Sequence, residues 1–145
     1  MLLCRVHQAV CALPIRQVIE TLRPLPLEPL ASAPSFVCGV SILRGVPVPV
    51  VDLGLLLAAE QVQPGRFVAL RAGAHTVAIA VSAVIGVHTL GGGAERELPP
   101  LLRDAAGNVV RSLGSLDREL LLVLDSARLV PDELLARLLS PGRPS

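Results

Sequence analysis

Three cysteines and a histidine in the first part of the chain are the side chains best suited to chemistry. Cys4, His7, Cys11 and Cys38 could together supply the four ligands of a zinc site. Structural zinc sites usually draw two ligands from a Cys-x-x-Cys pair, and this sequence contains no such pair. The spacing therefore favours buried thiols that pack as small apolar side chains, and we expect neither a metal nor another cofactor.

Two further segments resemble catalytic motifs only in part. Gly91-Gly92-Gly93 is not followed by the lysine and the Ser or Thr that complete a phosphate-binding loop. Ser115 lies in the segment Leu-Gly-Ser-Leu-Asp, which lacks the second glycine of a nucleophile elbow. The acidic residues are scattered, and no close carboxylate pair stands out for acid–base catalysis. The sequence therefore predicts a protein that is not an enzyme.

The composition argues against nucleic acid as a partner. The 145 residues include 13 arginines, no lysine and 12 acidic residues, so the formal net charge is only +1. Phe36 and Phe67 are the only aromatic residues, which leaves no stacking platform for unpaired bases. Apolar residues make up 52% of the chain, which is ample for the core of one compact domain.

An uncharged stretch of 23 residues, 72–94, is long enough to cross a bilayer as a helix. Its many valines and alanines, together with His75 and His88, favour buried strands instead. A small membrane protein built on this stretch stays open as a second alternative. The odd number of cysteines and the absence of an export signal predict a cytoplasmic protein without direct membrane insertion.

Thirteen prolines and twelve glycines divide the chain into short apolar segments. Most run for about five to seven residues, the usual length of a strand. Six prolines between positions 24 and 49 exclude a long helix there. The predicted strands are residues 2–8, 18–22, 37–43, 46–51, 67–71, 76–81, 85–90, 109–113 and 120–125. This pattern predicts an all-β fold, although the apolar positions of residues 2–13 fit a helical period equally well.

Two short helices are predicted beside these strands. Asp52 can cap a helical turn over residues 52–59, which carries three consecutive leucines. Pro131 suits the first position of a helix over residues 131–139, whose leucines form one apolar stripe. We expect that stripe to pack on the domain itself, and residues 140–145 to form a tail.

The segment from Phe36 to Leu53 reads as a strand, a turn at Arg44-Gly45, and a second strand that ends at Asp52. It resembles the signature of the CheW family of chemotaxis coupling proteins. That signature is an aromatic residue, x-Gly-Val, an Asn-Leu-Arg-Gly turn and a closing Pro-Val-x-Asp-Leu. Ile42 stands in the usual Asn place, and Ser82 stands where relatives commonly have Asp. Further similarity at residues 15–20, 77–87 and 116–125 extends the resemblance over most of the chain.

The resemblance implies a single CheW-like domain over residues 1–139, built from two five-stranded, SH3-like β-barrels. Subdomain 1 would comprise approximately residues 14–65. Subdomain 2 would comprise residues 1–13 together with 66–130.

The resemblance also implies a non-catalytic adaptor. Such a protein couples the cytoplasmic tip of methyl-accepting chemoreceptors to the regulatory domain of a CheA-type histidine kinase, and is recruited to membrane-associated receptor arrays. On the same basis Ile15 and Val18 lie near the receptor-binding groove, Glu20 lies beside it, Arg44 contacts partners, and Gly45 gives the turn its backbone conformation. The alternative function is regulation of a kinase in a non-chemotactic two-component pathway.

Arg44 also attracts attention for its own chemistry. A guanidinium at a turn between two apolar strands is either solvated or holds a carboxylate in its planar fork, and Glu20 is the partner that we predict. For Ile15 and Val18, ordinary core packing is as reasonable an interpretation as a partner site.

Overall fold

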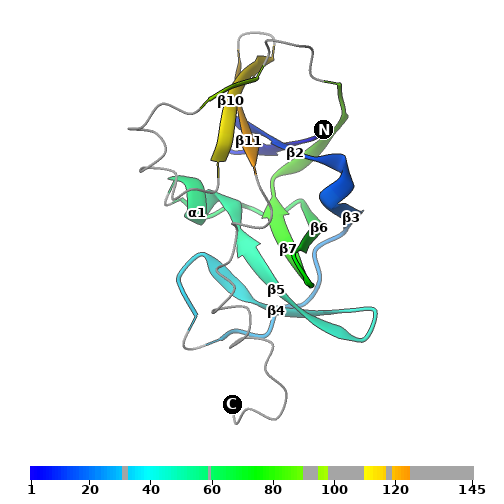
Figure 1. Cartoon of the computed structure of the whole chain (residues 1–145). Helices are drawn as coiled ribbons and strands as arrows, with labels where there is room; N and C mark the ends of the chain where they lie inside the picture. The colour runs from blue at the N-terminus through cyan, green and yellow to red at the C-terminus, as the bar shows by residue number, and fades with distance from the viewer. Residues whose placement is uncertain (31–32, 59, 90–94, 98–109, 117–118, 125–145) are drawn as a thin grey trace.

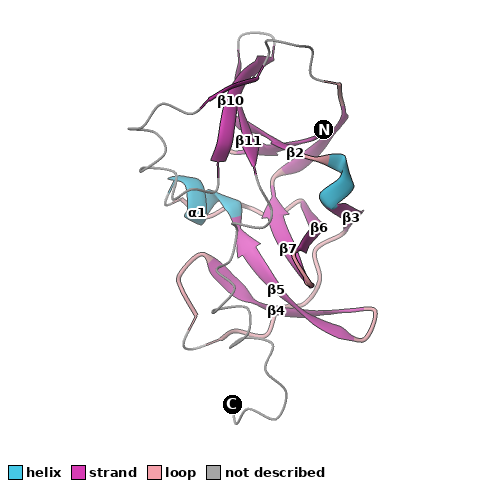
Figure 2. Cartoon of the chain, viewed as in Figure 1, coloured by secondary structure: helices cyan, strands magenta, loops and turns pink. Residues whose placement is uncertain are grey.

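The computed structural model describes residues 1–30, 33–58, 60–89, 95–97, 110–116 and 119–124, and strands dominate it (Figures 1 and 2). The strands are β1 (Leu2–Val6), β2 (Ala9–Leu13), β3 (Val18–Leu22), β4 (Val37–Leu43), β5 (Val46–Asp52), β6 (Arg66–Ala72), β7 (His75–Val81), β8 (Ala83–Val87), β9 (Glu95–Glu97), β10 (Val110–Leu116) and β11 (Glu119–Leu124). Two short helices accompany them, the 3-10 helix η1 (Ile15–Gln17) and α1 (Leu53–Ala58). The all-β prediction is confirmed, and residues 2–13 form a hairpin rather than a helix.

The strands form two sheets. The five-stranded sheet has the order β3-β6-β7-β5-β4, and the six-stranded sheet has the order β8-β1-β2-β11-β10-β9. In Figure 1 the five-stranded sheet lies in the lower half of the view and most of the six-stranded sheet in the upper half. We expected five strands in each unit, and the short β9, which pairs with β10, supplies the sixth.

The boundary between the two units differs from the expected division in one respect. We assigned residues 66–130 to subdomain 2, but β6 and β7 pair with β3 and β5 in the five-stranded sheet. The chain crosses to the other sheet at Ser82, not at Gly65. Pro64-Gly65 marks only a loop, because the apolar strand that follows returns antiparallel to β3, with Val18 opposite Leu70.

One hydrophobic cluster joins the two sheets. It combines Cys4 and Leu13 of the six-stranded sheet with Val51, Leu70 and Ile79 of the five-stranded sheet, all of them fully buried. Fully burying such an aliphatic side chain contributes about 1.5–3 kcal/mol. The shared cluster therefore couples the two sheets.

Asp52 fixes the helix that follows β5. Its Oδ1 accepts a hydrogen bond from the Leu55 amide at 3.0 Å, as the predicted cap requires. Both carboxylate oxygens also accept the Val62 amide, at 3.2 and 3.0 Å, and only 2% of Asp52 is exposed. The carboxylate thus ties the start of α1 to the loop that leads away from the helix.

The uncharged stretch 72–94 does not form the transmembrane helix of the second alternative, because its residues 75–81 and 83–87 are β7 and β8. These strands belong to different sheets. Within the described ranges no helix is both long enough and apolar enough to cross a membrane. Gly91-Gly92-Gly93, the predicted helix at 131–139 and the tail at 140–145 lie outside the described residues.

Candidate functional site

The turn between β4 and β5 places Arg44 at the tip of a hairpin. Leu43 pairs with Val46, so Arg44 and Gly45 are the two residues of a tight turn, with φ of 52° and 80°. Positive φ at both positions defines a type I′ turn, which usually has Asn, Asp or Gly first. Arginine in this conformation is strained, and such strain is often retained for function. No heavy atom lies within 4 Å of a Cβ placed on Gly45, so a side chain there would not clash. The turn favours glycine at this position for its backbone conformation, as predicted.

The predicted pair of Arg44 with Glu20 is confirmed. Arg44 Nε donates to Glu20 Oε2 at 2.9 Å, and a second guanidinium nitrogen donates to Oε1 at 3.1 Å. This fork geometry is the strong form of an Arg–carboxylate pair. The hydrogen bond from Arg44 holds the pKa of the Glu20 carboxyl below its ordinary value, and the same bond raises the pKa of Arg44.

The pair joins distant parts of the five-stranded sheet. Glu20 lies on β3 and Arg44 follows β4, and these are the two terminal strands of that sheet. The side chains are 26% and 76% exposed, and exposed ion pairs contribute little to stability because water and salt screen them. The main effect of this clasp, Arg44 with Glu20, is therefore to hold the hairpin tip against β3.

Aliphatic side chains are exposed on η1, β3 and β5. Ile15 of η1 is 51% exposed, whereas Val18 is half-buried and packs against the shared core cluster. Of the two predicted groove residues, Ile15 is thus a surface residue and Val18 is largely structural. Sequence reasoning missed Ile19 on β3 and Val46 on β5, which are 44% and 55% exposed. The alternation along β3 signalled Ile19, since it lies between the half-buried Val18 and Glu20 in the sequence.

The two departures from the family signature occupy different surroundings. Ile42 is 60% exposed beside the hairpin tip, where the usual Asn would offer a polar side chain. Ser82 lies where the chain crosses between the sheets, and its hydroxyl accepts the His7 amide at 3.4 Å. Ile42 enlarges the apolar surface beside Arg44. Ser82 instead accepts a hydrogen bond where the chain passes from one sheet to the other.

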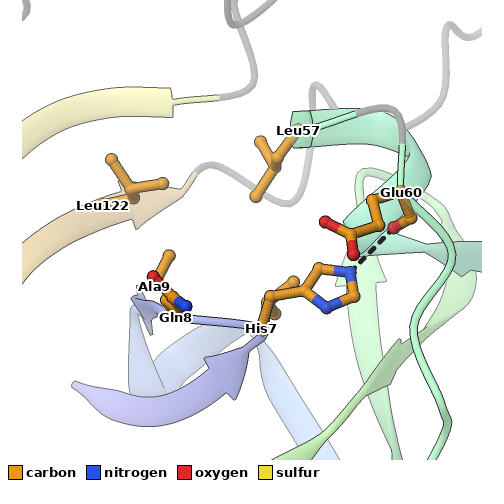
Figure 3. A pocket seen from close by; sticks show the side chains of 7 residues that line it. His7, Gln8, Ala9, Leu57, Glu60 and Leu122 are labelled. Carbon is orange, nitrogen blue, oxygen red and sulfur yellow. Dashed lines mark hydrogen bonds between the residues drawn. The ribbon is translucent and has the colours of Figure 1, made fainter.

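A pocket lies at the β1–β2 turn, near α1, and none of the predicted site residues lines it (Figure 3). Its volume is about 570 Å³, and its lining residues are Val6, His7, Gln8, Ala9, Leu57, Glu60 and Leu122. Within it, Nε2 of His7 lies 2.8 Å from the carbonyl oxygen of Glu60. This contact links the hairpin of the six-stranded sheet to the loop after α1.

The cysteines do not form a metal site in the part of the chain that the structure describes, where no three potential ligands converge. Cys4 and Cys11 lie directly opposite each other on β1 and β2, as free thiols. Burial raises the pKa of each to about 12, and for Cys11 the neighbouring Cys4 adds to the effect. Both are therefore protonated near neutral pH and unsuited to attack as nucleophiles.

A family model described as "CheW-like domain" matches residues 1–134. The chain belongs to the CheW-like domain family. The match takes in both sheets and the clasp, so the resemblance seen around Arg44 extends to the whole described fold.

The comparisons with individual proteins agree with this CheW-like assignment. The chain is 31% identical over 110 residues to the chemotaxis protein CheW of Klebsiella aerogenes. That match covers 74% of this CheW-like chain and 66% of the relative, slightly less than two thirds of the relative's length. The crystal structure of the scaffolding protein TtCheW from Thermoanaerobacter tengcongensis superposes with a TM-score of 0.76 at 18% identity, and the match covers 86% of each chain. This similarity shows a common fold.

Proposed function

We propose that this CheW-like domain is a non-catalytic adaptor that couples chemoreceptors to a CheA-type histidine kinase in chemotaxis. The observation that carries the proposal is the Arg44–Glu20 clasp, a bidentate pair on a strained turn with exposed aliphatic side chains on the elements around it. Family membership supports it, since the curated relative is named a chemotaxis protein and the solved one a scaffolding protein. The role would place the protein in the cytoplasm, recruited to receptor arrays at the membrane.

The receptor tip would dock on the side of η1 and β3. Ile15 and Ile19 offer apolar surface that is half or nearly half exposed in the free protein. Removing such surface from water contributes about 25 cal/mol per Å², so two isoleucines can hold one face of a receptor helix. The affinity of one site can stay modest, because an array presents many sites together and avidity multiplies their effect.

The kinase regulatory domain would dock at the hairpin tip. Arg44 uses two of its five N–H groups for Glu20, and its exposed side chain leaves the others accessible to a partner. Ile42 and Val46 flank the turn with apolar surface. Glu20 would act as a positioning residue, because it orients the guanidinium that a partner meets.

A direct binding experiment tests the proposal. The full chain is titrated separately with a receptor cytoplasmic fragment and with the regulatory domain of a CheA-type kinase, using calorimetry. The proposal expects binding to both, and a loss of kinase binding in Arg44→Glu. Binding to neither protein would refute it. Kinase binding without receptor binding would favour a regulator in a non-chemotactic two-component pathway.

A further inference from the structure

The outward face of η1 and β3 combines aliphatic and cationic side chains. We call its exposed residues the η1–β3 stripe, and they are Ile15, Arg16, Ile19, Thr21 and Arg23. Val18, Glu20 and Leu22 alternate with the exposed residues along β3 and are only half-buried. The stripe thus presents two isoleucines and two arginines, with Ile19 between the arginines.

No negative charge offsets these arginines along the stripe. Glu20 is the only acidic residue between positions 14 and 27, and the Arg44 fork engages its carboxylate. Among the described residues, the ion pairs that the structure shows do not include Arg16 or Arg23. Arg66 adds a further exposed cation at the end of the stripe, because Leu22 lies opposite Phe67 and Arg66 is thus next in register to Arg23.

We propose that the η1–β3 stripe selects a receptor helix that carries carboxylates on both sides of an aliphatic patch. This inference rests on the proposed function and specifies the chemistry of the receptor surface. Charge complementarity is the reason for choosing this occupant, since an apolar helix alone would leave both guanidinium groups without partners at the interface. A basic helix would be repelled.

The spacing of the two arginines adds a geometric requirement. Two steps of 3-10 helix and five of strand separate Arg16 from Arg23, which places their Cα atoms roughly 20 Å apart at 2.0 and 3.3 Å per residue. An α-helix rises 5.4 Å per turn, so its acidic groups would lie about four turns apart if it ran along the strand. Ile19, which lies between the two arginines, would then contact the turns between these acidic groups.

The test measures binding of the full chain to a receptor cytoplasmic fragment at about 50 and 300 mM salt. Arg16→Gln and Arg23→Gln should each weaken binding about two- to fivefold at low salt, as expected for exposed charge pairs. The double variant should also flatten the salt dependence, since fewer charges remain to be screened. Gln8→Glu changes the net charge by the same amount at an exposed position on the β1–β2 turn, and it should leave binding unchanged.

The outcomes separate this inference from the proposed function. If the wild-type chain binds no receptor fragment, the proposed function fails and the inference fails with it. If the wild type binds and the double variant binds equally well with the same salt dependence, only the inference is overturned. Vesicles of phosphatidylglycerol form the last arm of the test. Vesicle binding that the double variant loses while it retains receptor binding would also overturn the inference, in favour of an anionic membrane.

Discussion

Asp52 and Glu20 are two carboxylates at opposite extremes of burial, and each bonds to nitrogen donors. Asp52 is 2% exposed and accepts the part-buried amide of Leu55 and the buried amide of Val62. Glu20 accepts the guanidinium of Arg44 at the surface, where solvent competes for both partners. The comparison teaches that the buried carboxylate holds the fold, whereas the exposed one shapes a surface that other molecules meet.

Removal of the buried carboxylate should have the largest effect. Asp52→Ala leaves the Val62 amide buried without an acceptor and uncaps α1, so we expect unfolding free energy to fall by about 2–4 kcal/mol. Urea denaturation of the full chain measures this loss. Asp52→Asn keeps one acceptor oxygen and should lose less. If Glu20→Ala lowered the unfolding free energy as much as Asp52→Ala does, the two carboxylates would not differ in the way we describe.

Two glycines extend the same contrast between the interior and the surface. A Cβ at Gly54 would overlap the Glu60 carbonyl oxygen and lie 2.7 Å from Nε2 of His7, so Gly54→Ala should cost about 1–3 kcal/mol of stability. Gly45→Ala meets open space and suffers only from its positive φ, which costs about 1 kcal/mol. Thermal unfolding compares the two variants. The reverse ranking would show that the loop after α1 moves aside easily.

Reversal of the surface charge should change binding more than stability. Arg44→Glu places two carboxylates together at the hairpin tip and removes the donors that face a partner. We expect kinase binding to weaken about tenfold or more, with a melting temperature close to that of the wild type. Calorimetric titration and thermal unfolding measure the two quantities. Arg5→Gln is unsuitable as a control because Arg5 has an interaction within the domain, whereas Gln8→Glu lies on an exposed turn.

The Arg44–Glu20 clasp should weaken at low pH. The bond from Arg44 lowers the pKa of Glu20 from the ordinary value of 4.5, so the pair stabilises the hairpin above that pH and is lost as pH falls through the lowered value. NMR titration of the Glu20 side chain should give a midpoint below 4.5, and the midpoint should return toward 4.5 in Arg44→Gln. A midpoint at or above 4.5 in the wild type would mean that the clasp is not formed in solution. The expected effect on overall stability is small.

The features that short segments specify could be predicted from the sequence. Strand lengths and the Asp52 cap follow from local spacing. The Arg44–Glu20 pair spans 24 residues, and its prediction rests on the chemistry of the guanidinium and on the family resemblance. The sheet to which β6 and β7 belong depends on long-range pairing, and a loop at Pro64-Gly65 carries no information about it. The sequence also could not predict that Ile15 is exposed and Val18 half-buried, since the exposure of an aliphatic residue depends on what packs against it.

The most direct measurement asks whether one chain holds both proposed partners at once. The receptor fragment and the kinase regulatory domain are mixed with the full chain, and the masses of the complexes are determined by analytical ultracentrifugation. An adaptor with its receptor stripe on η1 and β3 and its kinase contact at the Arg44 hairpin predicts a complex of all three proteins, which Arg44→Glu reduces to chain and receptor alone. Two binary complexes that exclude each other, or no complex, would contradict this account.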